Sequence, residues 1–173
     1  MFYTMSRTIH TKRMKQIILC VVGLGSISVF AQTQMSIHEM LSLYQKTMDQ
    51  SAEQWLEKKY AKAKDGLYRA EDMISDNMPS PSNSYEWTGC CALKTYTLLL
   101  VRMVEVDQHC KEDQSKLCKE LMRQAMHWSD VLIDQARTWY QTKPSRPDVL
   151  SSRTQWLKRF QSAILRAQKL NTP

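Results

Sequence analysis

The segment 90–143 contains neither glycine nor proline, and this feature constrains the fold most strongly. Glycine and proline are the residues that most often end helices, so their absence over such a length favours long helices. The whole chain has only four glycines, and none of them forms a glycine-rich nucleotide-binding motif. The nucleophile elbow G-x-S-x-G and the zinc-binding H-E-x-x-H are also missing from the sequence. We therefore expect a helical chain, and no motif in it indicates an enzyme.

Residues 1–31 have the layout of a secretory signal peptide. Four basic residues precede an uncharged run, 17–30, which is too short to cross a bilayer comfortably as a helix. The run is followed by Ala31, in a context that a signal peptidase recognises, so we expect cleavage after Ala31. Residues 32–173 would then form a single domain, exported to the periplasm or the extracellular space. The alternative is an uncleaved anchor or a buried N-terminal helix.

Cleavage at this site would leave 20 basic and 17 acidic residues, a net charge of +3. Such a small excess does not indicate a nucleic-acid-binding protein, so we expect no nucleic-acid partner. Beyond the signal, no segment is apolar over the length that a transmembrane helix requires. We therefore expect no transmembrane segment in the mature chain.

The first predicted helix of the mature chain begins with a capping box. Ser36 can accept the amide of Glu39, whose side chain can reach back to the amide of Ser36. Apolar residues then recur at steps of three and four as far as Ala63, which indicates a helix that buries one face. We expect Asp65–Gly66 to break this helix, with a helical continuation over 67–74. A loop with two prolines, 77–84, follows.

Three further segments complete the predicted fold. A helix from Tyr85 or Trp87 to about Asp107 is apolar on most sides and should lie at the centre, although 96–106 could alternatively form a strand. The segment 117–139 has the cleanest helical periodicity, and the last helix begins near Asp148. Short connections between long amphipathic helices favour antiparallel neighbours. The sequence thus predicts an all-α protein, an up-and-down bundle of four to five helices.

Four cysteines lie beyond the signal. Cys91 and Cys110 would be about 28 Å apart along one helix, far beyond the reach of a disulfide, and Cys90 is just as far from Cys118. Cys110 and Cys118 flank a polar turn, so we expect a structural disulfide between them. Adjacent Cys90 and Cys91 are expected to be two small core residues; the alternatives are an intermolecular bridge or a soft-metal site.

The last predicted helix is the most strongly basic. Four of its cations lie within about 100° of one another on a helical wheel, roughly opposite an apolar stripe; they are Lys158, Arg159, Arg166 and Lys169. Such a face can bind an acidic partner or an anionic membrane, and the alternative is a solvated outer surface. A second basic run, at Lys58, Lys59, Lys62 and Lys64, is expected to be solvated.

Other side chains with catalytic or metal-binding chemistry are expected to be structural. His127 shares a face with four charged residues, which indicates a solvated surface with ion pairs rather than a proton shuttle. The leading hypothesis is an exported, non-enzymatic protein-binding bundle without cofactor or metal, such as an inhibitor or immunity protein, a chaperone or an envelope-complex subunit. The alternative is a soft-metal or cofactor carrier, with candidate ligands Cys90, Cys91, Met103 and His109. A third hypothesis is a hydrolase that uses Glu53, Glu57 or Asp130.

Overall fold

The structure, a computed structural model, describes residues 35–110, 115–144 and 149–170. The predicted signal peptide and its cleavage site lie outside these residues. Five helices account for most of the described chain, and no strand occurs in those three ranges. The helices are α1 Ile37–Leu56, α2 Tyr60–Asp76, α3 Ser84–His109, α4 Lys116–Gln141 and α5 Val149–Lys169. The predicted all-α fold is confirmed, and the strand alternative for 96–106 is wrong because these residues lie inside α3.

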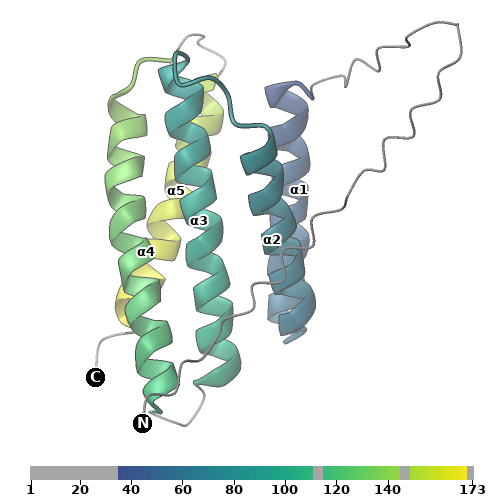
Figure 1. The fold of residues 1–173 in the computed structure, drawn as a ribbon, viewed down its shortest axis with the longest axis vertical. Helices are drawn as coiled ribbons and strands as arrows, with labels where there is room; N and C mark the ends of the chain where they lie inside the picture. The colour runs from purple at the N-terminus through teal and green to yellow at the C-terminus, as the bar shows by residue number, and fades with distance from the viewer. Residues whose placement is uncertain (1–34, 111–114, 145–148, 171–173) are drawn as a thin grey trace, which may run out of the picture. The chain divides into compact units, whose positions relative to one another are not determined.

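Consecutive helices run in opposite directions, so the chain forms an up-and-down bundle (Figure 1). Each helix packs against the next one along the chain, and α5 also packs against α3. The predicted capping box starts α1: Ser36 Oγ accepts from the amide of Glu39, and the Glu39 carboxylate accepts from the amide of Ser36. Buried residues occur on most sides of α3, as expected for the central helix.

The break between the first two helices lies at 57–59, and the predicted break at Asp65–Gly66 is wrong. Lys58 has a left-handed backbone, with φ at 60°. The amide of Lys58 donates to the carbonyl of Trp55, and that of Lys59 donates to the carbonyl of Gln54. These two bonds form a Schellman motif, which normally places glycine at the left-handed position. Gly66 instead lies inside α2, where a Cβ would collide with the hydroxyl of Ser51 on α1.

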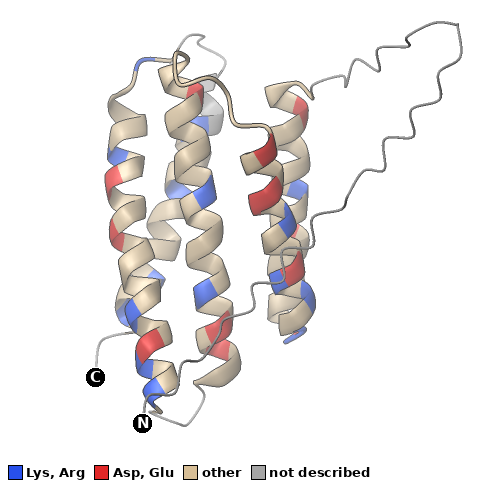
Figure 2. Ribbon diagram, viewed as in Figure 1, with Lys and Arg blue, Asp and Glu red and all other residues tan. Residues whose placement is uncertain are grey.

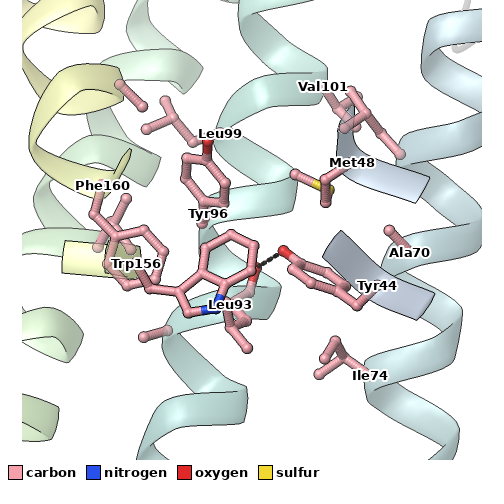
Figure 3. Packing of buried hydrophobic residues seen from close by; sticks show 14 of the residues in the cluster. Tyr44, Met48, Ala70, Ile74, Leu93, Tyr96, Leu99, Val101, Trp156 and Phe160 are labelled. Atoms are coloured by element: carbon pink, nitrogen blue, oxygen red, sulfur yellow. Dashed lines mark hydrogen bonds between the residues drawn. The ribbon is translucent and has the colours of Figure 1, made fainter. Parts of the chain in front are cut away.

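The core is built from aromatic and aliphatic side chains of all five helices (Figure 3). Tyr44 of α1 is fully buried, and its hydroxyl contacts two groups of α3: the Leu93 carbonyl at 3.0 Å and the Thr97 hydroxyl at 2.7 Å. The ring of Tyr44 also packs against Trp156 of α5, with 5.4 Å between ring centroids. Because a buried hydroxyl needs partners, this pair of bonds fixes the rotation of α1 against α3.

Helices α3 and α4 contact each other closely at both ends. A Cβ at Gly89 would lie 2.9 Å from the Trp139 ring, so only glycine lets the indole approach α3 this closely. At the other end, Cys110 and Cys118 lie at disulfide distance, with 5.5 Å between their α-carbons, as predicted. Arg153 of α5 donates to the carbonyls of Trp139, Tyr140 and Thr142 at the C-terminal end of α4. A cation at this end of a helix complements its dipole.

Candidate functional site

The four basic residues predicted on α5 occupy two different environments. Lys158, Arg166 and Lys169 are exposed and Arg159 is half-buried, and the two arginines also reach across toward α1. The expectation that all four are exposed holds for three of them and is wrong for Arg159, because α1 lies beside one edge of this face. We call the four residues the α5 basic face. Their role in partner binding stays a prediction.

Arg159 is half-buried and engaged within the protein. Its Nη1 lies 3.0 Å from Oδ1 of Asp49 on α1, and its guanidinium lies over the ring of Trp156, 4.9 Å from the centroid. About 29% of the side chain of Arg159 and 51% of that of Asp49 stay accessible, so water screens the pair. Arg159 consequently orders the contact between α1 and α5 while keeping part of its charge available.

Arg166 lies two turns further along α5. Its guanidinium carbon is 4.4 Å from the centroid of the Trp55 ring, a cation–π contact with α1. The indole of Trp55 is itself oriented by a hydrogen bond from its Nε1 to Asp107 of α3, at 3.0 Å. Among the described residues, no carboxylate lies within ion-pairing distance of Arg166. The tryptophan therefore positions a guanidinium whose hydrogen-bond donors have no anionic partner in the part of the chain that the structure describes.

The outward side of α5 carries an exposed leucine that sequence reasoning missed. Leu165 is 51% exposed and follows Lys158 by seven residues and precedes Lys169 by four, so the three share one side of the helix. The signal was visible in the sequence, since Leu165 lies outside the apolar stripe that faces the core. Leu165 is thus an exposed apolar side chain with an exposed lysine on either side of it along α5.

A groove of about 400 Å³ lies between α1, α3 and α5, next to Arg159 and Arg166. Apolar residues from all three helices form most of its wall; among them are Met48, Ala52, Leu100, Met103 and Ala163. Its charged lining consists of three basic residues, Lys58, Arg159 and Arg166, and one carboxylate, Asp107. The groove therefore combines an apolar interior with a net positive rim. Leu56, which is 83% exposed, lies at the same site.

The two remaining cysteines lie at the opposite end of α3 from the disulfide. Cys90 is buried, and burial raises the pKa of its thiol to about 12. Cys91 is half-buried, and burial also raises the pKa of its thiol. Both groups are therefore poor thiolate donors at neutral pH. The predicted core placement describes Cys90 well, while Cys91 lies at the edge of the core.

The candidate ligands for a soft metal do not converge. Cys90 and Met103 are separated by about 20 Å along the continuous helix α3, at the standard rise per residue. His109 lies at the far end of the same helix and is exposed. In the described part of the chain, no group of three or more histidine, cysteine or acidic residues could hold a metal ion.

The other candidate side chains lie on the surface. His127 is exposed on α4, where Arg123 binds Glu120 through two hydrogen bonds of 2.8 and 2.6 Å. These bonds lower the pKa of Glu120 to about 2. The carboxylates of the hydrolase hypothesis, Glu53, Glu57 and Asp130, are likewise exposed. In the second basic run Lys59 pairs with Glu57 at 2.6 Å and Lys64 with Glu105 at 3.9 Å.

None of the described helices is long and apolar enough to span a membrane. Charge is distributed unevenly among them: α2 and α4 carry both signs (Figure 2), whereas α5 contains five basic residues and no acidic one. The candidate site is therefore the α5 basic face with the adjoining groove. No protein-family model matches the chain, and no match is found among curated proteins or solved structures.

Proposed function

We propose that this chain is an exported, non-enzymatic binding protein that recognises an acidic protein through the outward side of α5. The single observation that carries the proposal is the charge of that helix. Among the described helices α5 alone lacks an acidic residue, while five basic residues lie along it. Charge of one sign on one side of a small protein selects a partner of the opposite sign and speeds its association.

The local surface of α5 fits this role. Lys158 and Leu165 are exposed on the outward side, and among the described residues no carboxylate pairs with Lys158. A protein interface commonly has an apolar centre and a polar or charged rim. Leu165 would supply the apolar contact, and Lys158 and Lys169 would contact carboxylates around it. An inhibitor, an immunity protein, a chaperone or an envelope-complex subunit each needs a surface that binds another protein, and this side of α5 would supply it.

Two features that are typical of exported proteins support the export that we propose. The layout of residues 1–31 is that of a signal peptide, and Cys110 and Cys118 lie at disulfide distance, as in many proteins of oxidising compartments. Because α3 and α4 contact each other closely at both ends, the bundle should present a rigid surface, and a rigid surface lowers the entropic cost of binding.

The test is a charge reversal confined to the outward side. The protein purified from the producing cell is immobilised and used to capture partners from the exported fraction, at low and at high salt. We expect Lys158→Glu/Lys169→Glu to weaken capture by about tenfold or more, because each lysine–carboxylate contact becomes a repulsion. Arg159 and Arg166 are left unchanged, since their reversal would also disturb the contacts with Asp49 and Trp55.

The matched control is Lys116→Glu/Lys119→Glu, which makes the same charge change at two exposed positions of α4. Circular dichroism should show that both variants keep the helical fold. Capture that is equally strong with the α5 variant and with the unchanged protein would disprove the proposal. Equal weakening by both variants would indicate a general effect of net charge and would also contradict a site on α5.

A further inference from the structure

The groove between α1 and α5 exists because large side chains hold the two helices apart at its ends. Tyr44 and Trp156 meet at one end, and Trp55 and Arg166 meet at the other. Between these ends the facing sides include three small residues, Ala52, Ser162 and Ala163, beside the longer Met48 and Arg159. The gap is therefore a consequence of residue size. At about 400 Å³ it falls within the roughly 300–1,000 Å³ typical of small-molecule sites.

The interior of the groove is suited to a hydrocarbon chain. Met48 contributes from α1, and Leu100 and Met103 contribute from α3. Leucine and methionine side chains pack well against aliphatic ligands, and methionine adapts to irregular shapes. The 83% exposure of Leu56 leaves a further apolar surface beside the groove. Burial of a ligand chain would thus be favoured along most of the length of the groove.

The polar groups of the groove favour an anion. Arg166 is held over Trp55 with no carboxylate partner in the described chain, and Arg159 retains partial exposure beside Asp49. Tyr96 also lines the groove, and its hydroxyl points away from Trp156 (Figure 3). Burial raises the pKa of Tyr96 to about 12, so its hydroxyl keeps the proton that it can donate.

Two carboxylates lie near these groups and each has a partner within the protein, but the indole that binds Asp107 is neutral and leaves the charge of Asp107 in place. Asp107, the one carboxylate of the lining, accepts the hydrogen bond from Trp55 Nε1 at 3.0 Å. Asp49 pairs with Arg159 at the edge. Lys58 adds a third positive charge to the lining. A guanidinium binds a carboxylate through two parallel hydrogen bonds, which makes Arg166 the best positioned group for an acidic ligand.

We propose that this groove binds a single-chain aliphatic carboxylate. Its chain would lie against Met48, Leu100 and Met103, and its carboxylate would meet the guanidinium of Arg166, with Arg159 and Tyr96 close by. This inference goes beyond the proposed protein partner, because it uses the inner edge of the α5 basic face. Lys158, Leu165 and Lys169 lie outside the lining of the groove.

The test uses three ligands that share a chain and differ in their head group. Dodecanoate, dodecanol and dodecyltrimethylammonium are titrated into the protein purified from the producing cell, and the heat of binding is measured. The two ions are kept below their micelle-forming concentrations and dodecanol below its solubility limit. We expect one dodecanoate per chain, with dodecanol bound about tenfold or more weakly and the ammonium weaker still. Equal affinity for dodecanoate and dodecanol, or no binding of dodecanoate, would overturn the proposal.

Two variants with matched controls locate the site. Ser162→Trp fills the groove from an exposed position of α5, and Gln161→Trp places the same ring one residue away, outside the lining. We expect only Ser162→Trp to abolish dodecanoate binding. If Ser162→Trp does not fold, Ala52→Trp fills the groove from the opposite helix. Retained binding in a folded, groove-filled variant would overturn the proposal.

The head-group contact has its own pair of variants. Arg166→Gln should lower the affinity for dodecanoate about tenfold and leave that for dodecanol unchanged. Lys158→Gln, which removes the same charge outside the groove, should change neither. The Lys158→Glu/Lys169→Glu variant should bind dodecanoate normally even if it loses its protein partner, so the two proposals fail separately. If Ser162→Trp abolishes partner capture and dodecanoate does not bind, the groove belongs to the protein partner and the carboxylate proposal is wrong.

Discussion

The contact between α3 and α4 and the contact between α1 and α5 are built in opposite ways. Between α3 and α4, Trp139 lies directly on Gly89 at one end, and Cys110 and Cys118 lie at disulfide distance at the other. Between α1 and α5, Tyr44 and Trp156 meet at one end, and Arg166 covers Trp55 at the other. A groove of about 400 Å³ remains between α1 and α5.

If the proposed binding is right, this difference separates the part of the bundle that stabilises the fold from the part that binds. Between α3 and α4 the ring of Trp139 occupies the space that a side chain at position 89 would need, so this end of the contact is closely packed. The contact between α1 and α5 instead retains a groove and the guanidinium of Arg166, which has no anionic partner among the described residues, and the proposed ligand would use both. We therefore expect changes between α3 and α4 to act on folding, and changes between α1 and α5 to act chiefly on binding.

The largest effect should come from truncating a core side chain of α4. Leu132 is fully buried, and we expect Leu132→Ala to lower the free energy of unfolding by about 2–5 kcal/mol through lost burial and the cavity left behind. The matched control is Leu165→Ala on the exposed side of α5, which should change it by roughly 0.5 kcal/mol or less. Urea unfolding followed by circular dichroism measures both. Similar losses at the two positions would mean that α5 is as tightly packed as α4.

The second largest effect on the free energy of unfolding should come from removing the Cys110–Cys118 pair between α3 and α4. Cys110 and Cys118 are eight residues apart, and closing so short a loop stabilises by about 2–3 kcal/mol on the chain-entropy model. We expect Cys110→Ala/Cys118→Ala to lose this amount, and a reductant to lower the stability of the unchanged protein by a similar amount. The reductant should have no further effect on the double variant. An effect there would indicate that Cys90 or Cys91 takes part in another bridge.

The sequence predicted the fold well wherever the spacing of apolar residues agreed with the residues that start or end helices. The capping box at Ser36, the central helix α3 and the Cys110–Cys118 pair all follow from local spacing. The break between α1 and α2 did not, because Tyr60 and Ala63 continue the apolar stripe of α1 even though the chain reverses at Lys58. Both helices of the hairpin bury their apolar residues in the same core. The steps of three and four between apolar residues therefore continue from α1 into α2 without an interruption at the turn. A lysine with φ at 60° gives no signal of its own, since glycine usually occupies that position.

The candidate site was less predictable, for a geometric reason. A helical wheel places Arg159 and Arg166 at the edge of a basic face, but it says nothing about which helix lies beside that edge. Their partners, Asp49 and Trp55, lie far earlier in the chain, on α1. The groove depends on small residues contributed by α1 and α5 together, among them Ala52 and Ser162, and no single segment displays that coincidence.

The smallest expected effect on stability comes from a substitution in the contact between α1 and α5. We expect Asp49→Asn to lower the free energy of unfolding by only about 0.2–1 kcal/mol, because both partners of the Asp49–Arg159 pair are accessible to water. If the groove takes a carboxylate, the same change should strengthen dodecanoate binding, since Arg159 loses its competing anion. The control is Asp134→Asn, which removes the carboxylate 3.4 Å from Arg137 on α4, away from the groove, and should leave binding unchanged. A stability loss well above about 1 kcal/mol at Asp49 would show that this ion pair, rather than the aromatic contacts, holds α1 against α5, and the contrast between the two contacts would then fail.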